Sequence, residues 1–307
     1  QPLPDDLAPT YINLEGFVLK DDGGVDTKGA LAPSDVPTGA TVVLSISNIV
    51  DGTVQSDIVD NMIVSPEARA EHMANVVELV SEYGAAGVEI AYGNISPALS
   101  QDFSTLVAEL GQALHAENKF LAVRVDTPVA AGPTWDTGAY DWRALSRTAD
   151  LIRLPAMLSL DSYADGGEMD ALLSWATRMV DRRRIDLVID TCAHVMNDRR
   201  VEPISYASAL GILAGEIETD TEDEELPPGK VIRLGLASEN NVALEYHADA
   251  RTYWFTPESG QSAGSTVLLE NAASVSRKLQ YIDRYALGGV SISAMLNGEN
   301  DPDIMHV

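Results

Sequence analysis

The chain has 307 residues, 45% of them hydrophobic, so it is long enough to bury one large core. It carries 47 acidic against 20 basic residues, and this net charge of −27 disfavours nucleic acids and anionic membrane surfaces as partners. No apolar run of 18 residues is present, which argues against membrane insertion. The lone cysteine, Cys192, excludes an internal disulfide framework, and five scattered histidines give no reason to expect a metal or another cofactor.

Strand-like and helix-like segments alternate along the chain, which predicts an α/β fold built from parallel βαβ units. Ser65 and Pro66 form a typical helix start. Further predicted helices span 102–115, 168–183 and the first part of 265–304. The predicted strands fall within 10–25, 40–49, 87–93, 119–128, 149–157, 184–194 and the second part of 265–304.

Residues 205–264 depart from this alternation. They contain an acidic, proline-containing run at 216–230, followed by short β segments. The run lacks the Asp/Asn/Gly spacing of a calcium loop, so we expect a solvated loop there.

Residues 65–97, SPEARAEHMANVVELVSEYGAAGVEIAYGNISP, resemble the segment leading into strand four of family 18 glycoside hydrolases. The stretch 265–304 resembles the ending of the family's bacterial cell-wall and spore-cortex variant. The resemblance covers roughly residues 10–304 and implies a (β/α)8 TIM barrel. On this interpretation 1–307 is a single chitinase-like barrel, with a small α+β insertion at 205–264 between strands seven and eight.

The first barrel strand is hard to find, because only about ten residues precede Tyr11. Either the N-terminal stub supplies a degenerate strand, or that strand is missing because the chain is a fragment of a longer protein. Gln1 fits a mature end left by processing.

The family's active-site motif is degenerate here. Family 18 enzymes carry D-x-x-D-x-D-x-E on strand four, and its four acids fall on Ala86, Glu89, Ala91 and Gly93. Alternate side chains of a strand face the same side, so positions 89, 91 and 93 point into the barrel. Glycosidic cleavage needs an acid to protonate the leaving oxygen, and the position of that acid is a glycine.

Two further components are absent. Pro155–Leu158 replaces the family's Met-x-Tyr-Asp pattern after strand six, and Ser293 replaces the tryptophan of strand eight. These losses predict a catalytically inactive domain, not an enzyme, that acts as an extracellular or cell-surface scaffold with glycan binding. The alternative is an active glycosidase on N-acetylglucosamine-containing polymers that uses a relocated acid, Asp126 or Glu89.

Because side chains alternate between the two faces of a strand, several charged residues are expected to point into the barrel. Acids and arginines would neutralise one another there. The pattern predicts an ion pair between Glu89 and Arg124 on adjacent strands, and places Asn13 and Asp186 inside as well. Either a structural salt-bridge network or a polar ligand site results. The candidate binding residues are Glu15, Glu89, Arg124, Asp126, Arg153, Asp190, Trp135 and Tyr140.

Aromatic residues in predicted loops suggest the partners. Trp135 and Tyr140, together with Trp142, Tyr253 and Trp254, fall near the expected barrel mouth or in the insertion. Such rings either stack on the sugars of a glycan or cell-wall polymer, or mark an interface for self-assembly or a partner protein.

Overall fold

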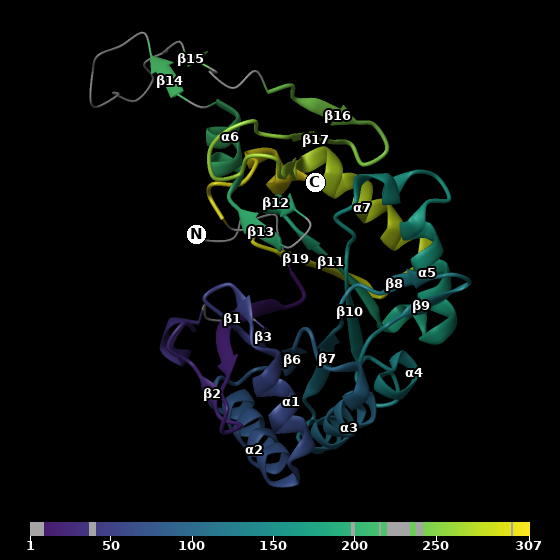
Figure 1. Ribbon diagram of the computed structural model, residues 1–307. Coiled ribbons are helices and arrows are strands. Elements are labelled where there is room, and N and C mark those ends of the chain that lie inside the picture. Colours follow the sequence, from purple (N-terminus) through teal and green to yellow (C-terminus); the bar gives the residue numbers. More distant parts are fainter. Residues whose placement is uncertain are drawn as a thin grey trace.

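The structure is a computed structural model that describes residues 9–36, 41–197, 200–214, 216–219, 234–237, 242–295 and 297–307. Its centre is a curled eight-stranded sheet with the order β19-β11-β10-β7-β6-β3-β1-β2 (Figure 1). Seven of these strands are parallel, and β2 (Val25–Asp26) pairs antiparallel with β1. The parallel strands are β1 (Ile12–Leu19), β3 (Val42–Ser47), β6 (Gly87–Ala91), β7 (Phe120–Arg124), β10 (Leu151–Pro155), β11 (Ile185–Asp190) and β19 (Gly289–Ser293).

This sheet confirms the predicted α/β fold of the TIM-barrel type. Helices connect successive strands: α1 (Ser56–Val64) and α2 (Pro66–Glu82) follow β3, α3 (Ser100–Ala116) follows β6, and α5 (Glu168–Met179) follows β10. Residues 1–8, where a degenerate first strand is predicted, lie outside the described residues. The remaining helices of the barrel are α4 (Trp142–Leu145), α7 (Ala272–Tyr285) and the short 3-10 helices η1 (Pro33–Asp35), η2 (Pro97–Leu99), η3 (Leu160–Tyr163), η4 (Arg182–Arg184) and η5 (Pro302–His306).

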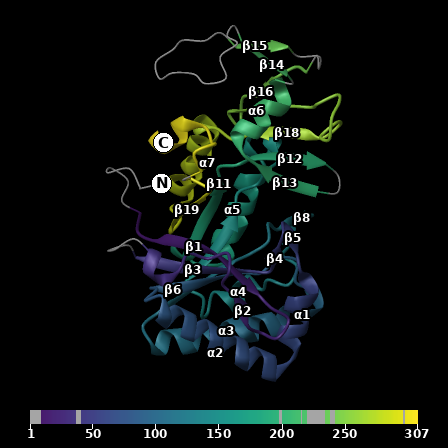
Figure 2. The ribbon, with the colours of Figure 1, turned by 90° about the vertical axis from the view of Figure 1, so that its left-hand side faces the viewer.

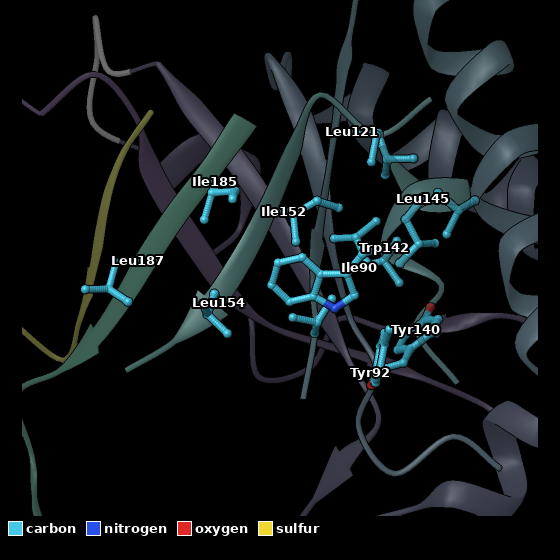
Figure 3. Packing of buried hydrophobic residues seen from close by; sticks show 14 of the residues in the cluster. Ile90, Tyr92, Leu121, Tyr140, Trp142, Leu145, Ile152, Leu154, Ile185 and Leu187 are labelled. Carbon is cyan, nitrogen blue, oxygen red and sulfur yellow. The ribbon is translucent and has the colours of Figure 1, made fainter. Parts of the chain in front are cut away.

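The core lies between the sheet and these helices. Ser65 caps α2 by accepting a hydrogen bond from the backbone N–H of Ala68, as the sequence predicts. Outward-facing strand residues such as Ile90 and Leu121 pack with residues from the connecting segments, including Tyr140 and Trp142 (Figure 3). Of the helices in the described ranges, none is long and apolar enough to cross a membrane.

A second, antiparallel sheet follows the carboxyl end of β11 (Figure 2). Its order is β13-β12-β18-β17-β16, and α6 (Tyr206–Ala214) packs against it. The strands are β12 (Ala193–Asn197), β13 (Arg200–Ile204), β16 (Glu245–His247), β17 (Thr252–Phe255) and β18 (Thr266–Leu269). The sheet therefore also takes strands from outside 205–264, because β12 and β18 supply its centre.

Three two-stranded pairs complete the described structure. Of the acidic run 216–230, residues 216–219 form β14 (Glu216–Thr219), which pairs with β15 (Leu234–Ala237), and the rest of the run lies outside the described residues. Two further hairpins follow the carboxyl ends of barrel strands. They are β4 (Ile49–Val50) with β5 (Thr53–Val54), and β8 (Val129–Ala131) with β9 (Thr134–Asp136).

Glu89 lies at the centre of the barrel interior and is completely buried. Arg124 on β7 places Nε 2.8 Å from its Oε1, and Arg153 on β10 places Nη1 2.9 Å from its Oε2. Ser45 on β3 donates a further hydrogen bond to Oε2 at 2.8 Å. The predicted ion pair between Glu89 and Arg124 is confirmed.

Arg153 extends this network to the outer strands. Its Nη1 donates to Oδ1 of Asn13 on β1 at 3.2 Å, and its Nε lies 4.0 Å from Oδ2 of Asp186 on β11. Burial disfavours the charged form of Glu89, but the positive charges of Arg124 and Arg153 outweigh it and lower its pKa. Glu89 is therefore a buried, ionised group whose charge the two arginines neutralise.

We predict that Arg153→Met destabilises the protein by about 3–5 kcal/mol, because it leaves the buried Glu89 charge without its most buried partner. Chemical denaturation at neutral pH measures this change. Arg143→Met, at an exposed position on α4, is the control and is expected to change stability by less than about 0.5 kcal/mol.

The pH dependence has a defined sign. The folded-state pKa of Glu89 is lowered, so its stabilising contribution is present above the unfolded-state pKa and is lost as pH falls through the folded-state pKa. The deficit of Arg153→Met should therefore shrink at low pH, where Glu89 is protonated in both proteins. An equal deficit at all pH values, or none, would contradict the assignment.

Candidate active site

Gly93 follows β6 at the carboxyl end of the barrel sheet, and its backbone is held by one side chain. Asn48, completely buried after β3, accepts a hydrogen bond from the Gly93 N–H at 2.9 Å and donates one to the Gly93 carbonyl at 3.0 Å. The next residue, Asn94, has a φ of 55°, a left-handed conformation that asparagine tolerates better than most residues. These contacts fix the turn that follows β6.

The Asp126 carboxyl group lies beside this turn. A Cβ atom at position 93 would lie 3.4 Å from Oδ1 of Asp126 and 3.7 Å from a methyl group of Val54. Oδ2 of Asp126 accepts a hydrogen bond from the Asn94 N–H at 3.0 Å. Asp126 therefore occupies space next to the position from which the family's proton donor would project.

The surroundings of Asp126 favour its neutral form. The residue keeps an exposed surface, yet partial burial of its carboxyl group raises its pKa above the ordinary value. Glu89 has the opposite environment, with a lowered pKa and no exposed surface. Of the two relocated acids that the sequence suggests, Asp126 therefore fits a proton donor better than Glu89, whose pKa is lowered and whose side chain has no exposed surface.

A second carboxylate ends barrel strand β11. Oδ1 of Asp190 accepts a hydrogen bond from the Cys192 N–H at 2.9 Å, and Oδ2 lies 3.6 Å from Nε2 of His194. Burial raises the pKa of Asp190, but the nearby His194 imidazole and the hydrogen bond from the Cys192 N–H outweigh burial, so its pKa is lowered. Burial raises the pKa of the Cys192 thiol to about 12, so that thiol stays neutral.

The charges of Glu15, Asp190 and Glu89 all act on the guanidinium of Arg124. Glu15 is exposed on β1, next to a bulge at Gly16, where the register with β3 shifts by one residue. The charges of Glu15 and Asp190 thus act on Arg124 across neighbouring strands, and the role of these residues in binding stays a prediction.

The aromatic candidates separate into buried and accessible rings. Tyr140 is 1% exposed and packs edge-on against Phe103, so its expected role in stacking on sugars is wrong. Trp142, the first residue of α4, is also buried, and its ring packs edge-on against that of Trp175. Trp135 on β9 keeps part of its surface accessible, and its role stays a prediction.

Two residues of this site were not singled out from the sequence. Asn48 follows β3 and holds the Gly93 backbone with its side chain, whereas Asn94, in the turn after β6, donates its backbone N–H to Asp126. Asparagine directly after a strand is a weak turn signal, and it does not reveal which peptide the side chain will hold.

Comparison with known proteins identifies the family. Residues 36–296 match the model of Glycosyl hydrolases family 18. The chain is 22% identical over 250 residues to a Bacillus subtilis (strain 168) protein named "Putative sporulation-specific glycosylase YdhD". That match covers 81% of this chain and 56% of the relative, so the chain spans about half the length of that curated protein.

Solved structures share the fold. A chitinase from Chromobacterium violaceum ATCC 12472 superposes with a TM-score of 0.72 at 20% identity, covering 96% of this chain and 89% of the chitinase. The spore cortex-lytic enzyme SleL from Bacillus megaterium QM B1551 gives a TM-score of 0.68 at 16% identity, covering 97% of this chain and 66% of SleL.

These matches overturn one expectation from the sequence. The missing motif acids argue that the chain is not an enzyme, but its relative is named a glycosylase and its structural neighbours are a chitinase and a lytic enzyme. The matched model also covers most of the chain. The chain therefore belongs to family 18 of the glycosyl hydrolases.

Proposed function

We propose that this protein is a glycosidase that cleaves an N-acetylglucosamine-containing polymer, with Asp126 as its proton donor. One observation carries the proposal. The Asp126 carboxyl oxygen lies 3.4 Å from the Cβ position of residue 93, where the family's proton-donating side chain would begin. The acid has moved from strand β6 to the residues that follow β7, while its place at the carboxyl face of the barrel is retained.

The environment of Asp126 suits a general acid. A proton donor must be protonated before it reacts, and partial burial favours that form by raising the pKa of Asp126. Its exposed surface leaves the carboxyl group accessible to a glycosidic oxygen.

In the proposed reaction the substrate supplies the nucleophile, as it does in this family. Asp126 gives its proton to the glycosidic oxygen while the bond between that oxygen and the anomeric carbon breaks. The acetamido carbonyl oxygen of the sugar then bonds to the anomeric carbon. Water subsequently attacks this carbon, the bond to the acetamido oxygen breaks, and a proton of the water returns to Asp126.

Asp190 supplies the second electrostatic element of the proposal. The positive charge that develops on the sugar needs an ionised carboxylate nearby, and the lowered pKa of Asp190 keeps it ionised. Asp126 and Asp190 thus have pKa values displaced in opposite directions, an arrangement that assigns one carboxyl group as acid and the other as charge stabiliser.

The charge of the protein bears on its substrate and location. A net charge of −27 repels polyanionic wall polymers, which favours a neutral N-acetylglucosamine polymer. Such polymers lie outside the cell membrane, so the proposal includes an extracellular or cell-surface location.

We predict that Asp126→Asn lowers kcat on a chitooligosaccharide by about 10²–10⁴-fold, because the amide cannot donate a proton to the leaving oxygen. Reducing-end release from the oligosaccharide, and in parallel from a peptidoglycan-derived fragment, is the measurement. Asp21→Asn, at an exposed acid in the turn between β1 and β2, should retain wild-type activity. A wild-type protein that cleaves neither substrate, or an Asp126→Asn variant that cleaves at the wild-type rate, would refute the proposal.

A rescue variant tests the geometry directly. The Cβ of a side chain at position 93 meets only ordinary van der Waals contacts, from Asp126 and Val54. Gly93→Glu combined with Asp126→Ala should therefore recover at least about tenfold of the activity that Asp126→Ala loses. Gly93→Gln in the same background is the matched control and should recover none. Equal activity of the two double variants would show that position 93 does not face the scissile bond.

A further inference from the structure

A group of exposed arginines lies at one end of the barrel of this acidic protein. They are Arg143 on α4, Arg147 just after it, Arg178 in the last turn of α5, and Arg182 and Arg183 on η4. Helices α4 and α5 lie side by side, because the ring of Trp142 packs edge-on against that of Trp175 (Figure 1). We call this set of residues the arginine patch.

Arg184 joins the segments that carry the patch. Its Nη1 donates to the backbone carbonyl oxygens of Ser146 at 2.8 Å and of Ala149 at 3.3 Å. The 3-10 helix η4 therefore lies against the residues between α4 and β10, where Arg147 is placed. Since α5 leads into η4, the patch is built on the two connections that enter β10 and β11.

The patch arginines are unpaired within the ranges that the structure describes. None of them forms an ion pair with a carboxylate or a hydrogen bond through its guanidinium group. Most other described arginines do pair with a carboxylate, namely Arg69, Arg124, Arg153, Arg200, Arg277 and Arg284. The acids on the same connections, Asp141, Asp150 and Asp181, each accept a backbone N–H. Unpaired positive charge thus collects here, in a protein whose net charge is −27.

The patch lies at the end of the barrel opposite to the candidate active site. The helix η4 leads directly into Ile185, the first residue of β11, whereas Asp190 is the last residue of that strand. This length of strand spans about 17 Å, or about two Debye lengths at physiological ionic strength. A ligand held by the patch is therefore separate from a substrate at the carboxyl ends of the strands.

The chemistry of arginine favours a phosphate ligand. A guanidinium group binds phosphate oxygens through parallel N–H donors, and it keeps its charge at every physiological pH. The net charge of −27 repels polyanions from most of the surface, so the ligand must be narrow enough to contact the patch alone. A flexible chain meets this condition, whereas a membrane or a duplex would bring a broad negative surface close to the acidic remainder of the protein.

We propose that the arginine patch binds a flexible polymer of phosphate groups. The biological meaning of this binding rests on the proposed function. A phosphate polymer at the cell surface would hold the enzyme beside the neutral polymer that it cleaves, with the carboxyl ends of the barrel strands facing away from the tether. The binding itself does not depend on catalysis.

The test is a titration of the whole protein with end-labelled linear polyphosphate, followed by fluorescence anisotropy. Binding should saturate and should weaken with salt, with a slope of log K against log salt of about −0.7 for each phosphate contacted. Arg182→Gln combined with Arg183→Gln should lower the affinity at least about fivefold, and Arg143→Gln combined with Arg147→Gln should do the same. Both variants should fold, because these side chains are exposed and make no polar contact in the described residues.

Lys20→Gln combined with Lys28→Gln is the matched control. It removes the same charge from exposed side chains that pair with Asp22 and Asp26. The control should change the affinity by less than about twofold, since these lysines lie more than a Debye length from the patch. An equal loss in the control and the patch variants would show that only net charge matters. Unchanged affinity in either patch variant would place the polymer elsewhere, and each of these results overturns the proposal.

Two other ligands separate the classes of partner. Poly-L-glutamate carries carboxylates in place of phosphates, and vesicles containing phosphatidylglycerol present a flat anionic surface. The wild type should bind both at least about tenfold more weakly than polyphosphate of equal charge. Comparable binding of poly-L-glutamate would indicate an acidic protein as the partner, and comparable binding of vesicles a membrane surface; either contradicts the proposal. If the wild type cleaves no substrate, the proposed function fails, yet the titration still decides what the patch binds.

Discussion

The neutralisation of one buried charge organises the interior of this barrel. Glu89 has no exposed surface, and an unpaired carboxylate there would be very costly. Arginines on the next two strands remove that cost, and Arg153 continues the network to Asn13 and Asp186. The contacts link strands from β1 to β11 at one level of the barrel. The groups proposed to take part in the reaction therefore lie in the next layer, at the carboxyl ends of the strands.

That upper layer carries acids whose environments differ. Asp126 lies beside Gly93, where partial burial raises its pKa, whereas the nearby His194 and the Cys192 N–H lower the pKa of Asp190. A Cβ at position 93 would lie 3.4 Å from Oδ1 of Asp126, and the Asn48 side chain holds the Gly93 backbone through two hydrogen bonds. Loss of the family acid and relocation of the acid are, in this account, parts of one local rearrangement.

Much of the fold and part of the site follow from the sequence. The strands were predictable because β-branched runs alternate with helical patterns, and side-chain parity paired Glu89 with Arg124. The alternation of side chains along a strand does not predict the course of the loop that follows the strand. The approach of Asp126 to Gly93 depends on the left-handed Asn94 and on the Asn48 contacts, and burial of Tyr140 depends on the loop before α4. The second sheet includes β12 and β18, which lie on either side of the predicted insertion in the sequence, because these two strands pair with each other.

The central claim is that the Asp126 carboxyl group delivers the proton to the glycosidic oxygen. It is tested most directly by comparing two pKa values in the wild-type protein: that of the Asp126 carboxyl by NMR, and that of the alkaline limb of kcat/KM on a chitooligosaccharide. The account predicts that the two coincide, because kcat/KM reports the essential acid of the free enzyme. An alkaline limb that follows a different pKa, or activity that persists after Asp126 has ionised, would contradict it.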